Sequence, residues 1–529
     1  MSQTTQKPKQ DNIDIAATSK KHLGKNTATN VMFAAFNAIT SIIMVPYQVR
    51  HLGIENYGVI VLASNFVTYF LQVFTVAVTG GVGRFVTLHV SREDYDQANS
   101  YLNTQYVASV ALIIVLIPLA AIISLLAPWL FIVPSGQENS TRLLFALCFA
   151  SFMVSLIMSM YRVSILVSQR FDVANLLDIL NQIARYSTWI IFFTLLTPRI
   201  WQIGTGYVLG VSTATICYGI MFTRLTPQLK PQLKGFDKSK FLDMIKMGGW
   251  MTVSQLGTML YLGVDAIIIN RVLGNANVGK YGLIAGLSLQ MQTMSSMMMY
   301  MVAGPAIASY AKQEWGQLMI TTTRAIKFMS LGMALLLGSI CGLALPFLMW
   351  WLGPNFKHLY LLIWLLLPHL VLNLGMTPLF AINYAANKMG APGIATLVGG
   401  FVKLVLALVL VKYTAWGIFA LAVADIIAVS LKNLGFMPLY SSQVIKGKSR
   451  PLYLAVIPAA IIFAVTSGTG LELSRLLNLA TLPRLFATGV VLLAAFGLVT
   501  YFLALNKEDR KLLREIAPLG RRKTATVPS

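Results

Sequence analysis

Long apolar runs separated by short polar connections follow one another along almost the whole chain. Each run is about 20 residues long, which is the length of helix that crosses the hydrocarbon core of a bilayer. The fourteen runs lie at 31–49, 57–80, 104–131, 143–167, 174–197, 201–223, 249–270, 281–304, 325–352, 359–384, 393–414, 416–440, 452–470 and 484–505. This pattern predicts an all-α polytopic membrane protein with about 14 transmembrane helices.

The runs and the polar stretches between them divide the chain into six segments. These are a basic N-terminal tail at 1–30, a lobe of six spans at 31–223, a cytoplasmic linker at 224–248, a second lobe of six spans at 249–440, spans 13 and 14 at 452–505 and a charged C-terminal tail at 506–529. In the linker, Phe241, Met244 and Ile245 recur at helical spacing among lysines. That spacing predicts a short interfacial helix, with a solvated basic linker as the alternative.

Composition and charge place the chain in a membrane and suggest its orientation. With 56% hydrophobic and 11% charged residues and a mean hydropathy of +0.70, 529 residues lack the polar surface of a soluble globule. Placing the N-terminus in the cytoplasm puts most of the 41 Lys and Arg residues on the cytoplasmic side. We therefore expect a multi-pass protein of the cytoplasmic (inner) membrane with both termini in the cytoplasm.

The excess of basic residues favours lipid headgroups as partners and not nucleic acid, because the chain has no basic helix or aromatic-basic stripe in a soluble context. The three cysteines are isolated inside apolar runs, so we expect no disulfide framework, metal site or cofactor. The polar N-terminus lacks a small-residue cleavage site after the first run. That first run should therefore remain as a span.

The loops predicted outside the membrane are too short for a catalytic domain, since none exceeds about 15 residues. Their candidate acids and bases are scattered over four loops. They are His51, Glu55, Glu138, His358 and Glu472. We predict no catalytic residues and no enzyme.

One phrase occurs twice at the same place in the two lobes. The stretch RHLGIENYG (50–58) joins spans 1 and 2, and RVLGNANVGKYG (271–282) joins spans 7 and 8. Because each unit has an even number of spans, both units enter the membrane in the same orientation. They are therefore related by a pseudo-twofold axis along the membrane normal. The alternative is that Arg and Gly are simply common at span ends. We equate Tyr57-Gly58 with Tyr281-Gly282 and expect left-handed glycines after each Leu and tyrosines in the interface.

These phrases, the stretch GGVGRF (80–85) and Asp265 six residues before Arg271 resemble the polysaccharide transporter branch of the multidrug/oligosaccharidyl-lipid/polysaccharide flippase superfamily. The fourteen spans and the charged tail are similar as well. The resemblance implies two lobes facing one another across a cavity that opens alternately to either side. It implies a Wzx-type flippase that moves a polyprenyl-pyrophosphate-linked oligosaccharide from the cytoplasmic to the outer leaflet, coupled to an ion.

The alternative functions are a multidrug exporter of the same superfamily or another secondary transporter. Multidrug exporters of this superfamily usually have twelve spans. A major facilitator would carry an acidic and arginine-rich loop after span 2, where this chain has only Arg92. The expected partners are the lipid-linked oligosaccharide and membrane lipids, with a polysaccharide polymerase or glycosyltransferases as further neighbours of a monomer.

Three arginines at span ends are candidates for binding the carrier's phosphates. They are Arg50, Arg84 and Arg271. A guanidinium matches phosphate oxygens bidentately, although ordinary interfacial anchoring explains such residues equally well.

Span 5 carries a polar stripe. Asp178, Asn181, Gln182 and Arg185 are spaced at i, i+3, i+4 and i+7, so they share one face of a helix. We expect this face to line the cavity, with Arg185 binding substrate, or to form a structural ion pair.

Amides in other spans could bind sugar hydroxyls or join helices to one another. The amide candidates are Asn37, Asn65, Gln72 and Gln255.

Ionisable residues inside spans are costly, at roughly 2.5–3.5 kcal/mol each, and therefore point to function or pairing. The predicted spans contain three basic and three acidic residues. The basic residues are Arg185, Lys403 and Lys432, and the acidic residues are Asp178, Asp265 and Asp425. Lys403 and Asp425 lie at similar depth on neighbouring spans, so we predict that they pair. These carboxylates and Lys403 serve either ion coupling or structure. His369, between two prolines of span 10, has no carboxylate near it in sequence, which favours a packing role.

Overall fold

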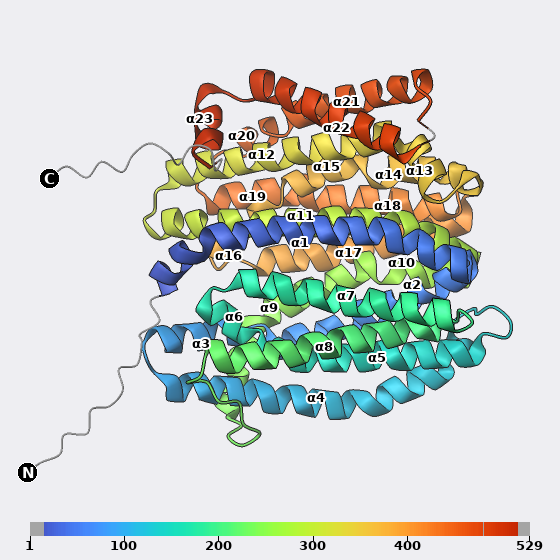
Figure 1. Cartoon of the computed structure of the whole chain (residues 1–529). Helices are drawn as coiled ribbons and strands as arrows, with labels where there is room; N and C mark the ends of the chain where they lie inside the picture. The colour runs from blue at the N-terminus through green and yellow to red at the C-terminus, as the bar shows by residue number, and fades with distance from the viewer. Residues whose placement is uncertain (1–14, 480, 517–529) are drawn as a thin grey trace, which may run out of the picture. The chain divides into compact units, whose positions relative to one another are not determined.

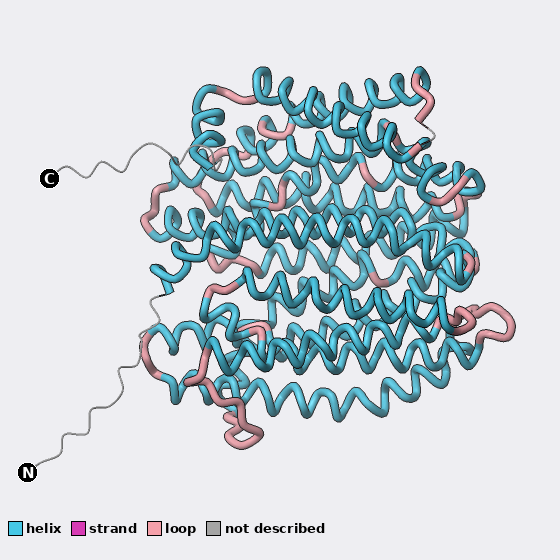
Figure 2. Tube along the Cα trace, viewed as in Figure 1, coloured by secondary structure: helices cyan, strands magenta, loops and turns pink. Residues whose placement is uncertain are grey.

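The computed structural model describes residues 15–479 and 481–516, and over these ranges the regular secondary structure is helical (Figures 1 and 2). Within them, twelve helices or runs of consecutive helices are long and apolar enough to cross a membrane. Predicted spans 5 and 8 coincide with two further long helices, of 25 and 37 residues. The all-α polytopic fold predicted from the sequence is confirmed.

The chain divides after Lys280 into two compact units, called here the first and the second unit. The helices that begin in the first unit are α1 (Ile15–Leu52), α2 (Ile54–Thr79), α3 (Val82–Ser91), α4 (Tyr95–Leu130), α5 (Glu138–Tyr161), α6 (Val163–Ser168), α7 (Phe171–Leu195), α8 (Trp201–Leu225), α9 (Lys238–Leu262), α10 (Val264–Leu273) and α11 (Asn275–Ala311). The boundary falls within α11, six residues after its start.

The helices of the second unit include two π-helical segments. They are α12 (Trp315–Gly342), α13 (Ala344–Trp351), the 3₁₀ helix η1 (Pro354–Leu359), α14 (Tyr360–Leu366), α15 (Pro368–Gly375), α16 (Pro378–Ala385), α17 (Gly390–Tyr413), α18 (Ile418–Ser430), the π-helix η2 (Leu431–Phe436), α19 (Met437–Val444), α20 (Arg450–Leu454), α21 (Ile457–Leu476), α22 (Leu482–Val499), the π-helix η3 (Thr500–Ala504) and α23 (Lys507–Ile516).

The linker predicted at 224–248 contains no separate interfacial helix. Asp237 caps α9 by accepting hydrogen bonds from the backbone N–H groups of Ser239 (2.9 Å) and Lys240 (3.3 Å), so α9 begins at Lys238 and continues into the membrane span. Met244 is fully buried. The residues that we read as an interfacial helix are therefore the first turns of a spanning helix.

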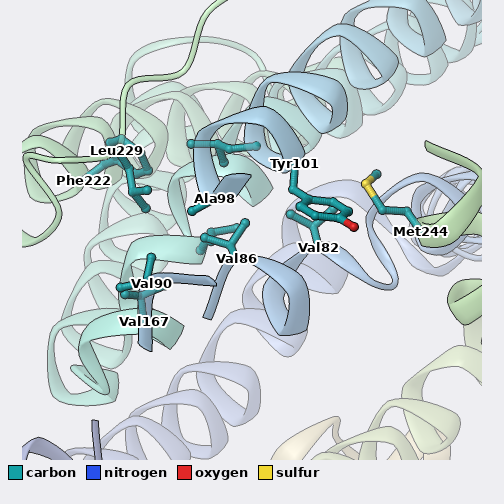
Figure 3. Packing of buried hydrophobic residues seen from close by; sticks show 11 residues of the cluster. Val82, Val86, Val90, Ala98, Tyr101, Val167, Phe222, Leu229 and Met244 are labelled. Atoms are coloured by element: carbon teal, nitrogen blue, oxygen red, sulfur yellow. The ribbon is translucent and has the colours of Figure 1, made fainter. Parts of the chain in front are cut away.

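A hydrophobic cluster explains why these turns are ordered. Figure 3 shows Met244 of α9 beside Val82 and Tyr101, in a cluster that also contains Val86 and Phe222. The cluster joins α3, α4, α6, α8 and α9 at one end of the unit, which is the end predicted to face the cytoplasm. Through Phe222 this packing also holds the end of α8, one of the helices that frame the site described below.

In the second unit, predicted span 10 is interrupted at its two prolines. Pro368 and Pro378 occupy the first positions of α15 and α16, where a missing N–H costs nothing, and the span is broken before each of them. The next predicted hairpin is regular, with α17 packed against α18, but the latter passes into the π-helix η2.

The C-terminal helix α23 is held against α12. Asn506 and Asp509 exchange backbone-to-side-chain hydrogen bonds of 2.8 and 3.3 Å, which start the helix. The buried Asp509 also accepts from Lys327 Nζ at 2.8 Å, and Arg324 pairs with Glu508. The charged tail predicted at 506–529 is thus anchored at its beginning.

Candidate functional site

A cavity of about 510 Å³ lies in the first unit among α2, α5, α7 and α8. Its lining residues include two arginines, Arg162 and Arg185, and no carboxylate. The remainder is mostly hydroxyl and amide side chains with a few apolar ones. A cavity of this size and chemistry suits the polar end of an anionic ligand.

One wall of the cavity is a stripe of serines on α5. Ser151, Ser155 and Ser159 recur every four residues, so they lie on one helix face. Each hydroxyl donates to the carbonyl three residues earlier, at 2.6–2.8 Å. Because a hydroxyl oxygen keeps acceptor capacity after donating, this wall can accept hydrogen bonds from ligand hydroxyls.

Arg185 of α7 lies among three aromatic rings. Its guanidinium carbon is 4.7 Å from the ring centroid of Tyr186, 5.5 Å from that of Trp189 and 5.6 Å from that of Tyr207. One terminal nitrogen donates to the Tyr186 hydroxyl at 2.9 Å, while the buried Nε has no hydrogen-bond partner within the described structure. Aromatic faces stabilise the cation without neutralising it, so Arg185 keeps both charge and a donor for an oxyanion.

The second arginine, Arg162, is neutralised. It forms an ion pair with Asp178 of α7, and its Nε donates to the Tyr218 hydroxyl at 3.2 Å. That hydroxyl in turn donates to Asp178 at 3.1 Å. The lining therefore carries about one uncompensated positive charge, that of Arg185.

The sequence count of buried charges left out Arg162, which the structure places inside the candidate span Glu138–Ser168. A signal was present, because Arg162 continues the α5 serine stripe three residues after Ser159. Asp178 pairs with Arg162 at the end of this neighbouring helix and not with a member of its own helical stripe.

The polar stripe of span 5 faces the cavity only in part. Asn181 and Arg185 line it, whereas Gln182 is buried and accepts a hydrogen bond from Thr40 of α1 at 3.3 Å. A stripe with this spacing covers about 100° of the helix surface, so its two edges meet different neighbours. The expectation that the whole stripe lines the cavity is wrong.

Of the other predicted substrate residues, Gln72 lines this cavity. Arg50, Arg84 and Arg271 are exposed and lie at other places, the last turns of α1 and α10 and the first turn of α3. Three amides, Asn37, Asn65 and Gln255, are part-buried and are not among the lining residues. Their roles stay predictions.

The two repeated turns have the same backbone. Gly53 has φ 81° and ψ 160°, and Gly274 has φ 82° and ψ 170°. Positive φ is as predicted, but this ψ belongs to the region open essentially to glycine and not to the left-handed helix. Tyr57 and Tyr281 are buried, so their predicted interfacial exposure is wrong.

The second unit holds a buried charge cluster. Lys403 Nζ of α17 lies 3.0 Å from Asp425 Oδ1 of α18, which confirms the predicted pair. His369 Nε2 of α15 lies 3.7 Å from the other oxygen of Asp425, a carboxylate that is distant in sequence. Its packing role stays a prediction. Nearby, Asn373 donates to Ser430 at 3.1 Å.

Asp265 is buried in the first turn of α10, where a carboxylate complements the helix dipole. Its role in coupling stays a prediction. Among the residues that the structure describes, no three His, Cys, Asp or Glu side chains gather in a group able to hold a metal ion.

The fold and its long apolar helices define a polytopic membrane protein. Its fold is similar to that of "Lipid II flippase MurJ, inward closed conformation", with a TM-score of 0.62 and 14% identity over 89% of this chain and 99% of that one. It is also similar to an inward-facing multidrug resistance MATE family transporter of the MOP superfamily, with a TM-score of 0.58 and 15% identity over 77% and 94% of the two chains.

Residues 23–311, more than half of the chain, match the polysaccharide biosynthesis protein family, and the chain belongs to this family. A relative from Bacillus subtilis (strain 168), the uncharacterized membrane protein EpsK, is 28% identical over 491 residues, covering 92% of this chain and 96% of that protein.

Proposed function

We propose that the protein is a flippase that moves a polyprenyl-pyrophosphate-linked oligosaccharide from the cytoplasmic to the outer leaflet by alternating access. The observation that carries the proposal is the cavity of the first unit, with Arg185 ringed by aromatic side chains beside a wall of serine hydroxyls. Such a site suits a ligand that combines an oxyanion with many hydroxyl groups, as a phosphate-linked sugar does.

Binding divides between two parts of the site. Arg185 bonds a phosphate oxygen of the carrier, and the serine stripe with Asn181 and Gln72 bonds sugar hydroxyls. The cavity volume falls within the range of about 300–1,000 Å³ that is usual for small-molecule sites. It therefore holds the sugar-phosphate end of the substrate while the polyprenyl chain stays in lipid.

The cluster of Lys403, Asp425 and His369 in the second unit couples transport to an ion. Asp425 lies between two basic groups, Lys403 and His369, in a segment where one neighbouring span is broken and the other turns π-helical. Irregular backbone beside buried ionisable groups is typical of coupling sites in transporters. When His369 is protonated, it competes with Lys403 for Asp425 and weakens the pair of Lys403 with Asp425. The cluster therefore has two charge states, with neutral and with protonated His369.

The multidrug exporter is the alternative function, followed by another secondary transporter. A cationic drug would meet two arginines and no carboxylate in the lining of the first-unit cavity. Without a counter-charge its desolvation would be uncompensated, so this chemistry favours the flippase.

The proposed function also implies a membrane location, an orientation and neighbouring proteins. The protein lies in the cytoplasmic membrane with both termini in the cytoplasm, as the Lys and Arg distribution favours. It acts as a monomer beside glycosyltransferases that build the substrate and a polymerase that uses it. It makes and breaks no covalent bond, so it needs no cofactor and is not an enzyme.

The proposal is tested in a deletion strain of the source organism complemented with wild type, Arg185→Ala or Arg142→Ala. Arg142 is the matched control, an exposed arginine on α5 that bonds Asn139 and the Leu125 carbonyl. We expect wild type and Arg142→Ala to restore surface polysaccharide and Arg185→Ala to accumulate lipid-linked precursor in the cytoplasmic leaflet. Normal surface polysaccharide in the uncomplemented deletion strain would refute the flippase and redirect the search to drug efflux.

A further inference from the structure

The turns at 50–58 and 271–279, called here the paired turns, are copies of one another in three dimensions. Aligned on Leu-Gly, they share Arg, Leu, Gly, Asn and a second Gly at the same positions. Asn56 donates to the Leu52 carbonyl at 2.8 Å, and Asn277 donates to the Leu273 carbonyl at 2.7 Å. The counterpart of Gly58 is therefore Gly279, and the register with Gly282 that we predicted from Tyr-Gly is wrong.

The paired turns touch each other through their backbones. A Cβ added to Gly58 would overlap the carbonyl oxygen of Asn275, and one added to Gly279 would overlap the carbonyl oxygen of Ile54. Ile54 and Asn275 are themselves counterparts, each directly following the positive-φ glycine. The contact thus maps onto itself when the two turns are exchanged, which is the signature of a local twofold. Only glycine allows two backbones to approach this closely.

A set of amide hydrogen bonds fastens the second turn to another part of the first unit. Asn270 is fully buried, accepts from the backbone N–H of Ile132 at 3.0 Å and donates to its carbonyl at 2.9 Å. It also donates to the Asn275 side chain at 2.6 Å, and Asn275 donates to the Ile132 carbonyl at 2.5 Å. Ile132 belongs to the connection between α4 and α5. We call this set the Asn270 clamp.

Both features lie next to the cavity. On α2, Gly58 comes six residues before Ser64, which lines the cavity. At the rise of an α-helix this places the glycine contact about 9 Å further toward the end predicted to face outward. The α4–α5 connection held by the clamp likewise precedes Cys148 of the cavity wall.

We propose that the paired turns and the Asn270 clamp form the outer gate, the contact that closes the cavity on its outer side and separates when the ligand leaves. The paired turns meet through tightly packed backbone without an ion pair, and the clamp consists of short amide hydrogen bonds. The energy of both interactions is lost when the groups move apart by a small distance. The gate therefore has a closed state and an open state, and intermediate conformations are little populated. The inference rests on the alternating access of the proposed function and is independent of its substrate.

The native Cys148 reports on the gate, because it is buried and lines the cavity. In a Cys217→Ser, Cys341→Ser background, a membrane-impermeant maleimide is added outside intact cells and the labelling rate of Cys148 is measured. Gly58→Ala inserts a methyl group into the backbone contact and holds the turns apart, so we expect the rate to rise about tenfold. Gly279→Ala should raise it equally, since the contact is reciprocal.

The matched control is Gly286→Ala on α11, where an added Cβ meets nothing within 4 Å. It should label at the wild-type rate. Unchanged labelling in a Gly58→Ala protein that elutes as a folded species would overturn the gate. A rise with Gly58→Ala but not with Gly279→Ala would overturn its twofold character.

Asn270→Ala tests the clamp without adding an atom, which keeps the test valid even where an alanine at Gly58 prevents folding. The variant loses three hydrogen bonds of a buried amide, so we expect labelling to rise about tenfold. Asn139→Ala, in the first turn of α5 directly after this connection and bonded to the exposed Arg142, is its control. Equal labelling in the Asn270→Ala and Asn139→Ala proteins would overturn the clamp. Labelling that rises as expected while surface polysaccharide proves independent of the protein would keep the gate and reject the flippase.

Discussion

Arg185 in the first unit has a buried Nε without a hydrogen-bond partner in the described chain, whereas Lys403 in the second unit bonds Asp425 at 3.0 Å. Both are cations on helices that the sequence predicts to be spans. The first is surrounded by aromatic rings and hydroxyl groups, and the second by a carboxylate and a histidine. The difference separates two tasks, because a cation left uncompensated beside a cavity is available to a ligand, while a compensated one changes only when its own partners change.

The largest effect should come from breaking the compensated pair. Lys403→Met leaves Asp425 buried without its ammonium partner, and removing one member of a buried pair costs about 3–5 kcal/mol. Thermal unfolding in detergent, followed by a dye that reacts with the buried Cys148 and Cys341, should show a clear loss of stability.

The double variant Lys403→Met, Asp425→Leu separates a structural pair from a coupling site. Without an unpaired charge it should regain most of the lost stability. If the cluster couples transport to an ion, this stable protein does not transport. A double variant with normal transport and ion dependence would make the pair purely structural.

The next largest effect should appear at the cavity. Arg185→Gln removes the uncompensated charge but leaves the fold, so binding of inorganic pyrophosphate to the detergent-solubilised protein should weaken about 10–100-fold, from the loss of about 1.5–3 kcal/mol of charged hydrogen bonding. Isothermal titration calorimetry measures this change, with Arg142→Gln as the control. Equal affinities in the two variants would place the anion elsewhere.

A smaller effect should follow from the serine wall. Ser155→Ala removes one acceptor from the middle of the stripe, at a cost of about 0.5–1.5 kcal/mol in binding of the glycan. Competition between a soluble sugar phosphate and pyrophosphate separates the two parts of the site, since the sugar should lose affinity and pyrophosphate should not. A loss shared by both ligands would contradict the division.

The spans, the break of span 10 at its prolines and the pair of Lys403 with Asp425 could be predicted from the sequence, because each depends on local composition or on the depth of neighbouring spans. The start of α9 was also readable, since Asp237 is a good N-cap directly before the helix. The lysines of this segment instead favoured an interfacial helix or a solvated linker, so the start of α9 was not predicted.

Contacts between helices that are distant along the chain could not be predicted in this way. His369 meets Asp425 only because α15 packs against α18, and Arg162 finds Asp178 across α5 and α7. The stripe of span 5 shows the same limit, as the spacing defines its face but the neighbours decide which edge lines the cavity. The reciprocal contact of Gly58 and Gly279 needed the backbone geometry of both turns.

The most direct test of the central claim is transport by the purified protein in liposomes that contain a polyprenyl-pyrophosphate-linked oligosaccharide. A membrane-impermeant glycosidase measures the fraction of oligosaccharide in the outer leaflet over time. We predict that wild type and Arg142→Ala exchange the lipid between leaflets and that Arg185→Ala does not. Exchange by Arg185→Ala at the wild-type rate, or none by wild type, would contradict the account.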